Sequence, residues 1–289
     1  MYSIGILGTL NIHSQIYLDL FNCNCDAAYS LNRARVNYIY GFDHALTQEV
    51  AIKGNVPFVV NSPSDMYDHI DAAMVIFRHG KYHAEYAIPF LERGIPVFID
   101  KPFTISNEDA EAIVNASEKY KTAIMGGSSL KYAPDLLSLK QMMGQTLGTV
   151  QAASISFPAT FSNEYGGLHF YGTHHVEMAL SLFGYDCRTV HAFKAGDAVT
   201  AVLHYDHFNV TLYFLPESKK NYIIIHGKND TVIREIDQTL IFKEQMRRFI
   251  AMLDTGEMPQ PPTELVDSVR VMNAVIEAIV SGKEVRCGR

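Results

Sequence analysis

The chain has 289 residues, of which 48% are hydrophobic and 19% are charged, and its formal net charge is -7. This length allows two domains of ordinary size, and the composition excludes a disordered chain. The negative charge, without any run of Lys and Arg, argues against nucleic-acid binding. No apolar stretch reaches the ~18 residues that a membrane span needs, so we expect no membrane association.

The four cysteines show neither a zinc-ligand pattern nor a disulfide framework. The first two stand too close together for the usual zinc pair, and no second pair follows them. We expect all four to be free thiols in a reducing compartment. They are Cys23, Cys25, Cys187 and Cys287. The first residues, MYSIGILG, lead into a strand pattern without the charged segment of a signal peptide, so we expect a cytoplasmic protein.

Residues 1–125 alternate between short apolar runs and helical patterns, which is typical of a doubly wound parallel sheet with helices on both faces. Ligands of such sheets lie beyond the carboxyl ends of the strands. The predicted strands are 3–7, 36–41, 57–60, 72–77, 96–100 and 122–126. The predicted helices are 12–21, 45–53, 83–93 and 106–120.

Residues 126–289 show a different pattern, which predicts an α+β domain with a mainly antiparallel, open sheet. Two of its strands are apolar on much of both faces, so we expect one face to form the interface of a homodimer or homotetramer. The predicted strands are 148–157, 188–195, 198–205, 208–215, 221–227 and 231–235. The predicted helices are 133–143, 241–254 and 263–281, with one more over the motif YGTHHVEMAL (171–180).

A turn with a single glycine, GTLNIH (8–13), follows the first predicted strand. A dinucleotide-binding turn has Gly at its first, third and sixth positions, and only Gly8 matches. Its place between a strand and a helix start still offers free N–H groups to a pyrophosphate, although an ordinary βα turn is the alternative. The candidate cofactor contacts in this turn are Gly8, Thr9, Leu10, Asn11 and Ile12.

Polar residues also follow the second and fourth predicted strands. Asp43 suits the ribose hydroxyls of an adenosine and would repel a 2′-phosphate, which favours NAD over NADP. It equally suits the N-cap of helix 45–53, and the two roles are compatible. Arg78, His79 and His83 lie at or near the end of the fourth strand and are candidate cofactor contacts, with a structural role as the alternative for His83.

Two further motifs carry groups suited to proton and charge chemistry. FIDKPF (98–103) ends the fifth strand with Asp100 and Lys101, which places a cation at the ligand edge unless the motif is a surface turn. In YGTHHVEMAL, His174 and Glu177 share one face of a helix. That face either packs a polar helix start into a core or presents a proton-transfer histidine.

Together these motifs resemble those of the Gfo/Idh/MocA family, which is named for glucose-fructose oxidoreductase and inositol dehydrogenase. The resemblance covers nearly the whole chain. It implies a dinucleotide-binding Rossmann domain at 1–125 and an α+β domain for substrate and oligomerisation at 126–289. The segments that carry it are DAAMVIFRHGKYHAEYAIPFLERGIPVFIDKPF (71–103), GGSSLKYAPDL (126–136), LGTVQAASISF (147–157) and GGLHFYGTHHVEMALSLFG (166–184).

The resemblance implies that Lys101 is catalytic, because the family's strand-5 motif is Glu-Lys-Pro and its Lys is catalytic. Asp100 is a conservative replacement of the Glu and a candidate cofactor contact. Two departures concern the cofactor: the glycine turn is reduced to Gly8, and residues 77–80 replace the family's usual Pro near the end of strand 4.

The family's second motif places one Asp four residues before a catalytic His and another Asp three residues after it. By this spacing His174 is the catalytic His, and Glu177 takes the later Asp position. Phe170 takes the earlier position, so its neighbour Tyr171 is our candidate for the missing polar group.

The function that the resemblance implies is hydride transfer between a nicotinamide, NAD rather than NADP, and a hydroxyl-bearing carbon of a sugar, cyclitol or related polyol. A His suits the base and a Lys suits the developing alkoxide. We expect Lys101 and His174 to flank one substrate hydroxyl. Further candidate substrate contacts are Lys131, Tyr132, His169 and His175, the last with a structural alternative.

Two alternatives stay open at this point. The first is a non-catalytic or regulatory ligand-binding member with a degenerate cofactor turn, which the single Gly8 and Phe170 support. The second is a lyase or hydrolase that recycles tightly bound NAD. No set of His, Asp and Glu has strong metal-ligand spacing, so we expect no metal site.

Overall fold

The computed structural model describes residues 1–22 and 31–288, which form two compact units. The first unit contains Met1–Gly127 and Phe242–Leu265, and the second contains Ser128–Ile241 and Val266–Arg289. The functional domain boundary after residue 125 stays a prediction. Within the described ranges, no helix is both long enough and apolar enough to cross a membrane.

The first unit contains a six-stranded parallel sheet with the order β3-β2-β1-β4-β5-β6, which confirms the predicted Rossmann-type sheet. Its strands are β1 (Tyr2–Leu7), β2 (Ala34–Tyr40), β3 (Phe58–Val59), β4 (Ala72–Val75), β5 (Val97–Ile99) and β6 (Ile124–Gly126). The strand order reverses between β1 and β4, and ligands of open α/β sheets bind beyond the strand ends at such a switch point.

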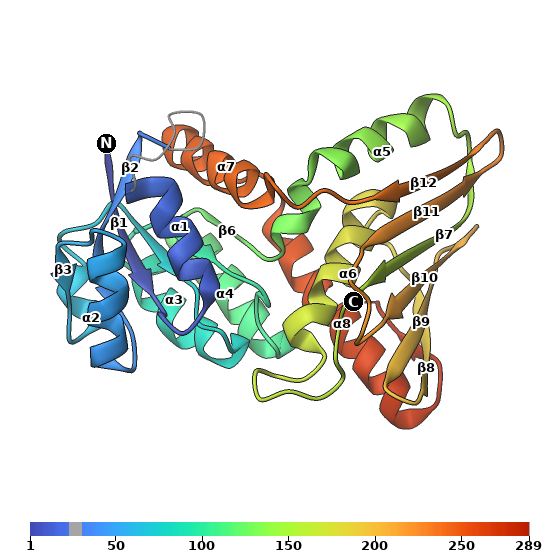
Figure 1. Ribbon diagram of the computed structural model, residues 1–289, viewed down its shortest axis with the longest axis horizontal. Helices are drawn as coiled ribbons and strands as arrows, with labels where there is room; N and C mark the ends of the chain where they lie inside the picture. The colour runs from blue at the N-terminus through green and yellow to red at the C-terminus, as the bar shows by residue number, and fades with distance from the viewer. Residues whose placement is uncertain (23–30, 289) are drawn as a thin grey trace. The chain divides into compact units, whose positions relative to one another are not determined.

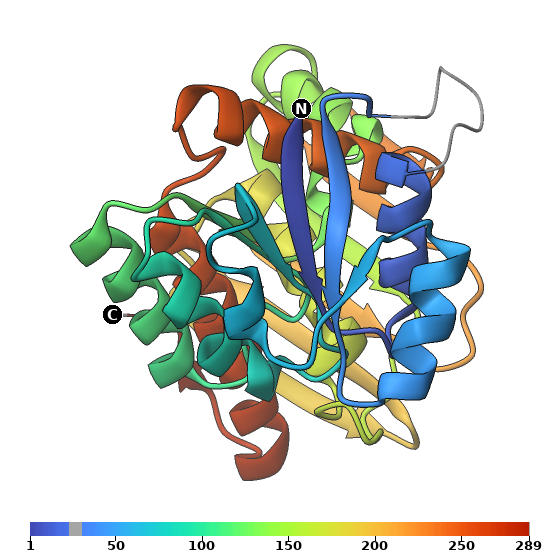
Figure 2. The ribbon, with the colours of Figure 1, turned by 90° about the vertical axis from the view of Figure 1, so that its left-hand side faces the viewer.

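Helices cover both faces of this parallel sheet. Figure 2 shows α1 and α2 on one side of the strands and α3 and α4 on the other. The helices of the sheet layers are α1 (Ile12–Asn22), α2 (His44–Lys53), α3 (His83–Leu91) and α4 (Asn107–Tyr120), with the short 3-10 helices η1 (Pro63–Met66) and η2 (Gly80–Tyr82). Ser106 caps α4 by accepting from the amide of Asp109.

A helix from the C-terminal part of the chain, α7 (Ile241–Thr255), completes the first unit. Its Phe249 ring lies 5.8 Å from the ring of Phe98 in β5, and both side chains are fully buried. Its amphipathic pattern predicts a helix but does not reveal which sheet the helix packs against.

The second unit contains a seven-stranded mixed sheet with the order β12-β11-β7-β10-β9-β8-β13. Neighbouring strands are antiparallel except for β7 and β10, so the predicted mainly antiparallel sheet is confirmed. The strands are β7 (Val150–Phe157), β8 (Thr189–Ala195), β9 (Ala198–His204), β10 (Asn209–Phe214), β11 (Tyr222–Gly227), β12 (Thr231–Glu235) and β13 (Val285–Arg286). The other elements are η3 (Ser129–Tyr132), α5 (Pro134–Gln145), α6 (His169–Phe183) and α8 (Pro262–Ser281).

The strands of this second sheet alternate between buried and accessible residues, because one face packs against helices. Figure 1 shows α6 and α8 on that face. On the opposite face several large apolar side chains are exposed. They include Phe193, Tyr213 and Ile233, which are 52%, 38% and 66% exposed.

The cysteine prediction is tested for two of the four residues. Cys187 and Cys287 are buried free thiols whose Sγ atoms lie 3.3 Å apart, where β13 pairs with β8. Cys23 and Cys25 lie outside the described residues.

Candidate active site

The turn after β1 requires glycine at its first position. Gly8 has a φ of +115°, and a Cβ added there would lie 2.7 Å from the backbone nitrogen of Phe77. The amide of Gly8 donates to the carbonyl of Tyr40 at 2.8 Å, which fixes the turn to the end of β2. The first glycine of the dinucleotide pattern therefore has its structural reason here, although the other two are absent.

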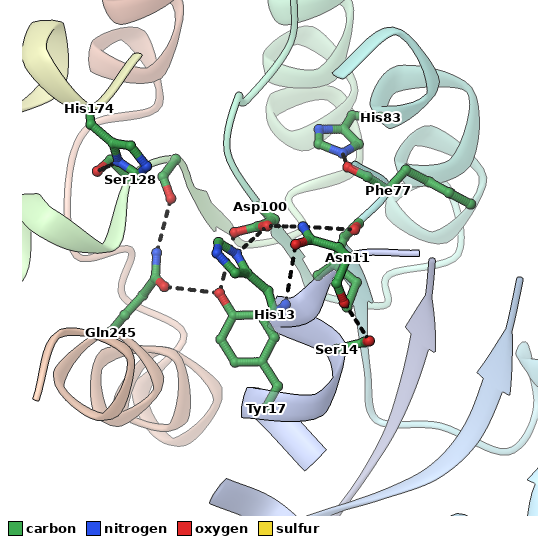
Figure 3. A network of polar contacts seen from close by, with 12 residues as sticks. Asn11, His13, Ser14, Tyr17, Phe77, His83, Asp100, Ser128, His174 and Gln245 are labelled. Atoms are coloured by element: carbon green, nitrogen blue, oxygen red, sulfur yellow. Dashed lines mark hydrogen bonds and ion pairs between the residues drawn. The ribbon is translucent and has the colours of Figure 1, made fainter. Parts of the chain in front are cut away.

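His13 occupies the position of the last glycine in that pattern, and its ring points into the protein interior. Its Nδ1 atom lies 2.7 Å from Oδ2 of Asp100, which also accepts from Nδ2 of Asn11 at 2.9 Å (Figure 3). His13 is only 9% exposed. Although His13 replaces a glycine, its side chain therefore leaves the outer surface at the start of α1 accessible.

The start of α1 fits the pyrophosphate of a dinucleotide. The amides of His13 and Ser14 bond within the turn, to the side chain and carbonyl of Asn11. In the described part of the chain, the amides of Leu10 and Ile12 have no acceptor, and their side chains are 57% and 74% exposed. The first turn of α1 carries no acidic residue. Free amides at the positive end of a helix are a suitable site for an anion.

Asp43 caps α2, as its sequence predicts, by accepting from the amide of Leu46 at 3.0 Å. Its carboxylate is exposed and has further acceptor positions, so the cap is compatible with binding a ribose. Beside it Phe42, which is 49% exposed, stacks on Phe77 with ring centroids 4.8 Å apart. These rings follow the ends of β2 and β4, and the exposed ring of Phe42 offers an apolar surface that sequence reasoning missed.

His83 ties together the segments that follow β4 and β5. Its Nε2 lies 2.8 Å from the carbonyl oxygen of Phe77 (Figure 3), and its Nδ1 lies 3.0 Å from the carbonyl oxygen of Phe103. The side chain is fully buried, and burial lowers its pKa although the two carbonyls act in the opposite direction. This geometry favours the structural role for His83. The neighbouring His79 caps η2 by accepting from the amide of Lys81.

Asp100 and Lys101 form a buried charged pair of neighbours at the end of β5. They are 1% and 2% exposed, respectively. Burial lowers the pKa of Lys101 to about 8, and the nearby Arg78 acts in the same direction while Asp100 opposes it. Burial raises the pKa of Asp100, but His13 and Lys101 outweigh burial and bring it to about 2. An ionised carboxylate thus lies beside an amine that titrates near neutral pH.

A chain of hydrogen bonds leads from Asp100 through Tyr17 and Gln245 to Gly127, all within the first unit. The hydroxyl of Tyr17 lies 3.3 Å from Oδ1 of Asp100 and 3.2 Å from Oε1 of Gln245 in α7. Nε2 of Gln245 donates to the carbonyl of Gly127 at 3.0 Å (Figure 3). Sequence reasoning missed this chain, because its members come from four separate segments.

In the second unit, α6 presents a buried carboxylate to the segment that follows β6. Glu177 accepts from Nζ of Lys131 at 2.9 Å and from the amide of Ser128 at 2.8 Å. The side chains of Lys131 and Glu177 are only 3% and 2% exposed. The hydroxyl of Thr173 adds a contact at 3.3 Å. The prediction that Lys131 contacts substrate is untested, and its ammonium here pairs with Glu177.

His174 lies on the same helix, with its Nδ1 atom 2.6 Å from the hydroxyl oxygen of Ser128 (Figure 3). The proposed polar substitute, Tyr171, is 41% exposed, and its ring centroid lies 6.3 Å from that of His174. Phe170 is buried. Ser128 was missed from the sequence, because nothing in the local pattern around it connects it to a helix 46 residues away.

The remaining substrate candidates differ in accessibility. His175 is fully buried, its Nε2 faces the carbonyls of Phe157 and Tyr213, and burial lowers its pKa to about 4. This favours its structural alternative. His169 contacts Oδ1 of Asn273 at 2.7 Å through Nε2. Tyr132 is buried, with its ring 5.4 Å from Nζ of Lys131.

The structure therefore brings the predicted residues together in two groups, one in each unit. The group of the first unit is Asn11, Asp100 and Lys101, joined by His13. The group of the second unit is Lys131, His174 and Glu177, joined by Ser128. Within the described residues, no cluster of His, Cys, Asp and Glu has the arrangement of a metal site.

Comparison with known proteins connects the first of these units to an enzyme family. Residues 2–128 match the Gfo/Idh/MocA profile, described as the oxidoreductase family with an NAD-binding Rossmann fold. For these residues the match confirms the predicted resemblance, and the description of the family agrees with the predicted cofactor, NAD. No curated protein matches the chain.

Solved structures share the fold over the whole chain. A putative myo-inositol dehydrogenase from Sinorhizobium meliloti 1021 is 16% identical with a TM-score of 0.84, and each chain is covered completely. GenD2 from gentamicin A biosynthesis, solved with NAD, is 14% identical with a TM-score of 0.86, covering 100% of this chain and 97% of that one. A scyllo-inositol dehydrogenase from Lactobacillus casei is 15% identical with a TM-score of 0.85, covering 99% and 98%.

Proposed function

Residues 2–128 of this chain belong to the oxidoreductase family with an NAD-binding Rossmann fold, and from this premise we propose a dehydrogenase that acts on a cyclitol or related polyol. The observation that carries the proposal is the buried pair Asp100 and Lys101 at the ligand edge of the sheet. A buried amine with a lowered pKa is typical of an active site.

The cofactor would be held at the edge formed by the ends of β1, β2 and β4. The free amides at the start of α1 suit the pyrophosphate, and Asp43 suits the ribose. The exposed ring of Phe42 offers an apolar surface beside Asp43. When bound, NAD supplies the acceptor for a hydride, while the protein supplies position and electrostatics.

The residues of the chain manage the proton and the developing charge. In the proposed reaction His174 would take the hydroxyl proton of the substrate through Nε2, while bound NAD would supply the hydride acceptor that lets the carbonyl form. The ammonium of Lys101 would stabilise negative charge on the substrate oxygen during this reaction. Asp100 stays ionised and keeps Lys101 partly protonated despite its burial.

A cyclitol or polyol suits this chemistry because it offers a secondary hydroxyl on which a base such as His174 and a cation such as Lys101 could act. The names of two solved structures with the same fold, both inositol dehydrogenases, support this substrate class. The family match favours an oxidoreductase over the two alternatives, a non-catalytic binding protein and an NAD-recycling lyase or hydrolase.

The accessible face of the second sheet supports assembly into a homodimer or homotetramer. It exposes Phe193, Tyr213 and Ile233, and its central strands carry mainly small, hydroxyl or apolar side chains there. A second copy of the same face would cover these side chains without opposing like charges. Light scattering of the wild type and of Tyr213→Lys tests this: the proposal expects an oligomer that the substitution dissociates, and a monomeric wild type contradicts it.

The activity is tested by incubating the purified protein with NAD and single cyclitols or sugar alcohols and following NADH. The proposal expects NADH to form with at least one of them, and the rate to fall by roughly 10²- to 10⁴-fold in Lys101→Met and His174→Asn. Binding of NAD without any turnover would favour the non-catalytic alternative. A product that forms without net NADH would favour the recycling enzyme.

A further inference from the structure

His174 has a hydrogen-bonding partner from outside its own helix. The hydroxyl oxygen of Ser128 lies 2.6 Å from Nδ1 of His174, and Ser128 is completely buried (Figure 3). His174 itself is 7% exposed. The distance is short for a neutral pair, so the hydroxyl closely controls the orientation of the ring.

Ser128 is itself fixed by two contacts that do not involve His174. Its backbone amide donates to Oε1 of Glu177 at 2.8 Å. Its hydroxyl oxygen accepts from the amide of Leu130 at 3.2 Å and thereby caps η3. The cap and the buried carboxylate therefore fix the position of the Ser128 hydroxyl independently of His174.

These contacts have a consequence for the tautomer of His174. A histidine that accepts a proton through Nε2 must carry its own proton on Nδ1, which then needs an acceptor. The hydroxyl oxygen of Ser128 has a second lone pair available for Nδ1–H, both before and after Nε2 is protonated. The same arrangement thus serves the neutral ring and the imidazolium.

We infer that Ser128 is a positioning residue that holds His174 in the Nδ1–H tautomer, with Nε2 as the proton acceptor. It takes the role that the sequence leaves open at Phe170, where the family has an acid. The effect of Ser128 on catalysis rests on the proposed function. The tautomer of His174 is a property of the protein alone and does not depend on that function.

The charged and polar groups around His174 are compatible with a neutral partner. Glu177 lies on the same helix but is paired with Lys131 of η3, so the two charges offset each other. The rings of Tyr171 and of Phe157 in β7 also lie near His174, with their centroids 6.3 and 5.3 Å from its own. A hydroxyl stabilises the imidazolium less than a carboxylate does, so we expect Ser128→Asp to raise the pKa of His174.

The test measures the tautomer directly in the full chain labelled with nitrogen-15 at histidine. Above the pKa of His174, the wild type is expected to show a protonated Nδ1 and an unprotonated Nε2. Ser128→Ala is expected to lose this preference. In the same variant kcat should fall by about 10²-fold with little change in KM, because a misplaced base loses its alignment with the substrate.

A matched control separates this role from simple loss of a helix cap. Ser106 caps α4 through the amide of Asp109 and has no place in the proposed site. Ser106→Ala is expected to lower thermal stability much as Ser128→Ala does, while His174 keeps its tautomer and the enzyme keeps its rate. Ser128→Asp serves as a second, capping-competent variant that is expected to shift the acid limb of the pH profile upward.

The outcomes distinguish this inference from the proposed function. A wild-type His174 with its proton on Nε2, or a Ser128→Ala variant with unchanged tautomer and rate, would overturn the role of Ser128. If the wild type reduces no NAD but shows the expected tautomer, the proposed function fails while the assignment of Ser128 to His174 stands.

Discussion

The Nδ1 atom of His13 lies 2.7 Å from the carboxylate of Asp100, and both residues are buried. In a dinucleotide-binding turn the position of His13 belongs to a glycine. Here the imidazole fills that place and bonds with the acid beside Lys101. The turn after β1 and the end of β5 are thereby joined by one hydrogen bond.

Replacing His13 should therefore destabilise the protein, because the buried carboxylate of Asp100 loses one of its hydrogen-bonding partners. We expect His13→Ala to lower the free energy of unfolding by about 1–3 kcal/mol, because a buried charged group loses a hydrogen bond. Asp100→Asn should be less costly in the His13→Ala background than in the wild type. Urea denaturation of the two single variants and the double variant measures this, and strictly additive losses would contradict the coupling.

The pKa of Lys101 predicts how the reaction depends on pH. In the proposed reaction the ammonium form of Lys101 stabilises the developing alkoxide, so kcat/KM for alcohol oxidation should fall as the pH rises through about 8. Lys101→Arg keeps its charge at every such pH, so its residual activity should lack this decline. Steady-state rates from pH 6 to 10 provide the comparison. A decline that persists in Lys101→Arg would assign it to another group.

Because Lys131 and Glu177 form a buried ion pair, removing one charge should cost more stability than removing both. Lys131→Met leaves Glu177 buried without its cation and should cost about 3–5 kcal/mol of stability. The double variant Lys131→Met/Glu177→Gln removes both charges and should recover much of this loss. Chemical denaturation of the wild type, Lys131→Met and the double variant at one pH measures these differences in stability. A double variant that is no more stable than Lys131→Met would show that the pair does not act as a unit.

His175 predicts a loss of stability in mild acid. Its folded pKa is about 4, well below the usual value near 6.5, because the ring is buried. The unfolded chain takes up a proton as the pH falls through ~6.5 while the folded protein does not, so stability declines by ~1.4 kcal/mol per pH unit until about pH 4. His175→Asn, which keeps a donor for the two carbonyls, should flatten the curve over this window. His83, whose pKa is also lowered, contributes the same pH dependence of stability to the wild type and to His175→Asn.

The features that sequence alone predicted are local ones. The parallel sheet follows from apolar strands that alternate with helices, and the cap Asp43 follows from its place just before a predicted helix. Element ends were less certain: the predicted strand 72–77 ends at Val75, and β13 was not predicted at all. Short elements of this kind depend on their neighbours rather than on their own residues.

The features that sequence did not predict join distant segments. His13 and Asp100 are 87 residues apart, and Ser128 and His174 are 46 apart. Neither pair follows from spacing, because the two partners of each pair belong to different elements that only the folded unit brings together. The replaced glycine and the replaced acid were visible as departures from the family, but the residues that compensate for them were not.

The most direct test of the account is the formation of NADH by the wild type with NAD and a panel of cyclitols and sugar alcohols, followed by absorbance at ~340 nm. The account predicts a steady rise with at least one substrate, and a rise slower by roughly 10²-fold or more in Lys101→Met and in His174→Asn. A wild type that binds NAD but produces no NADH with any of them, or variants that match its rate, would contradict it.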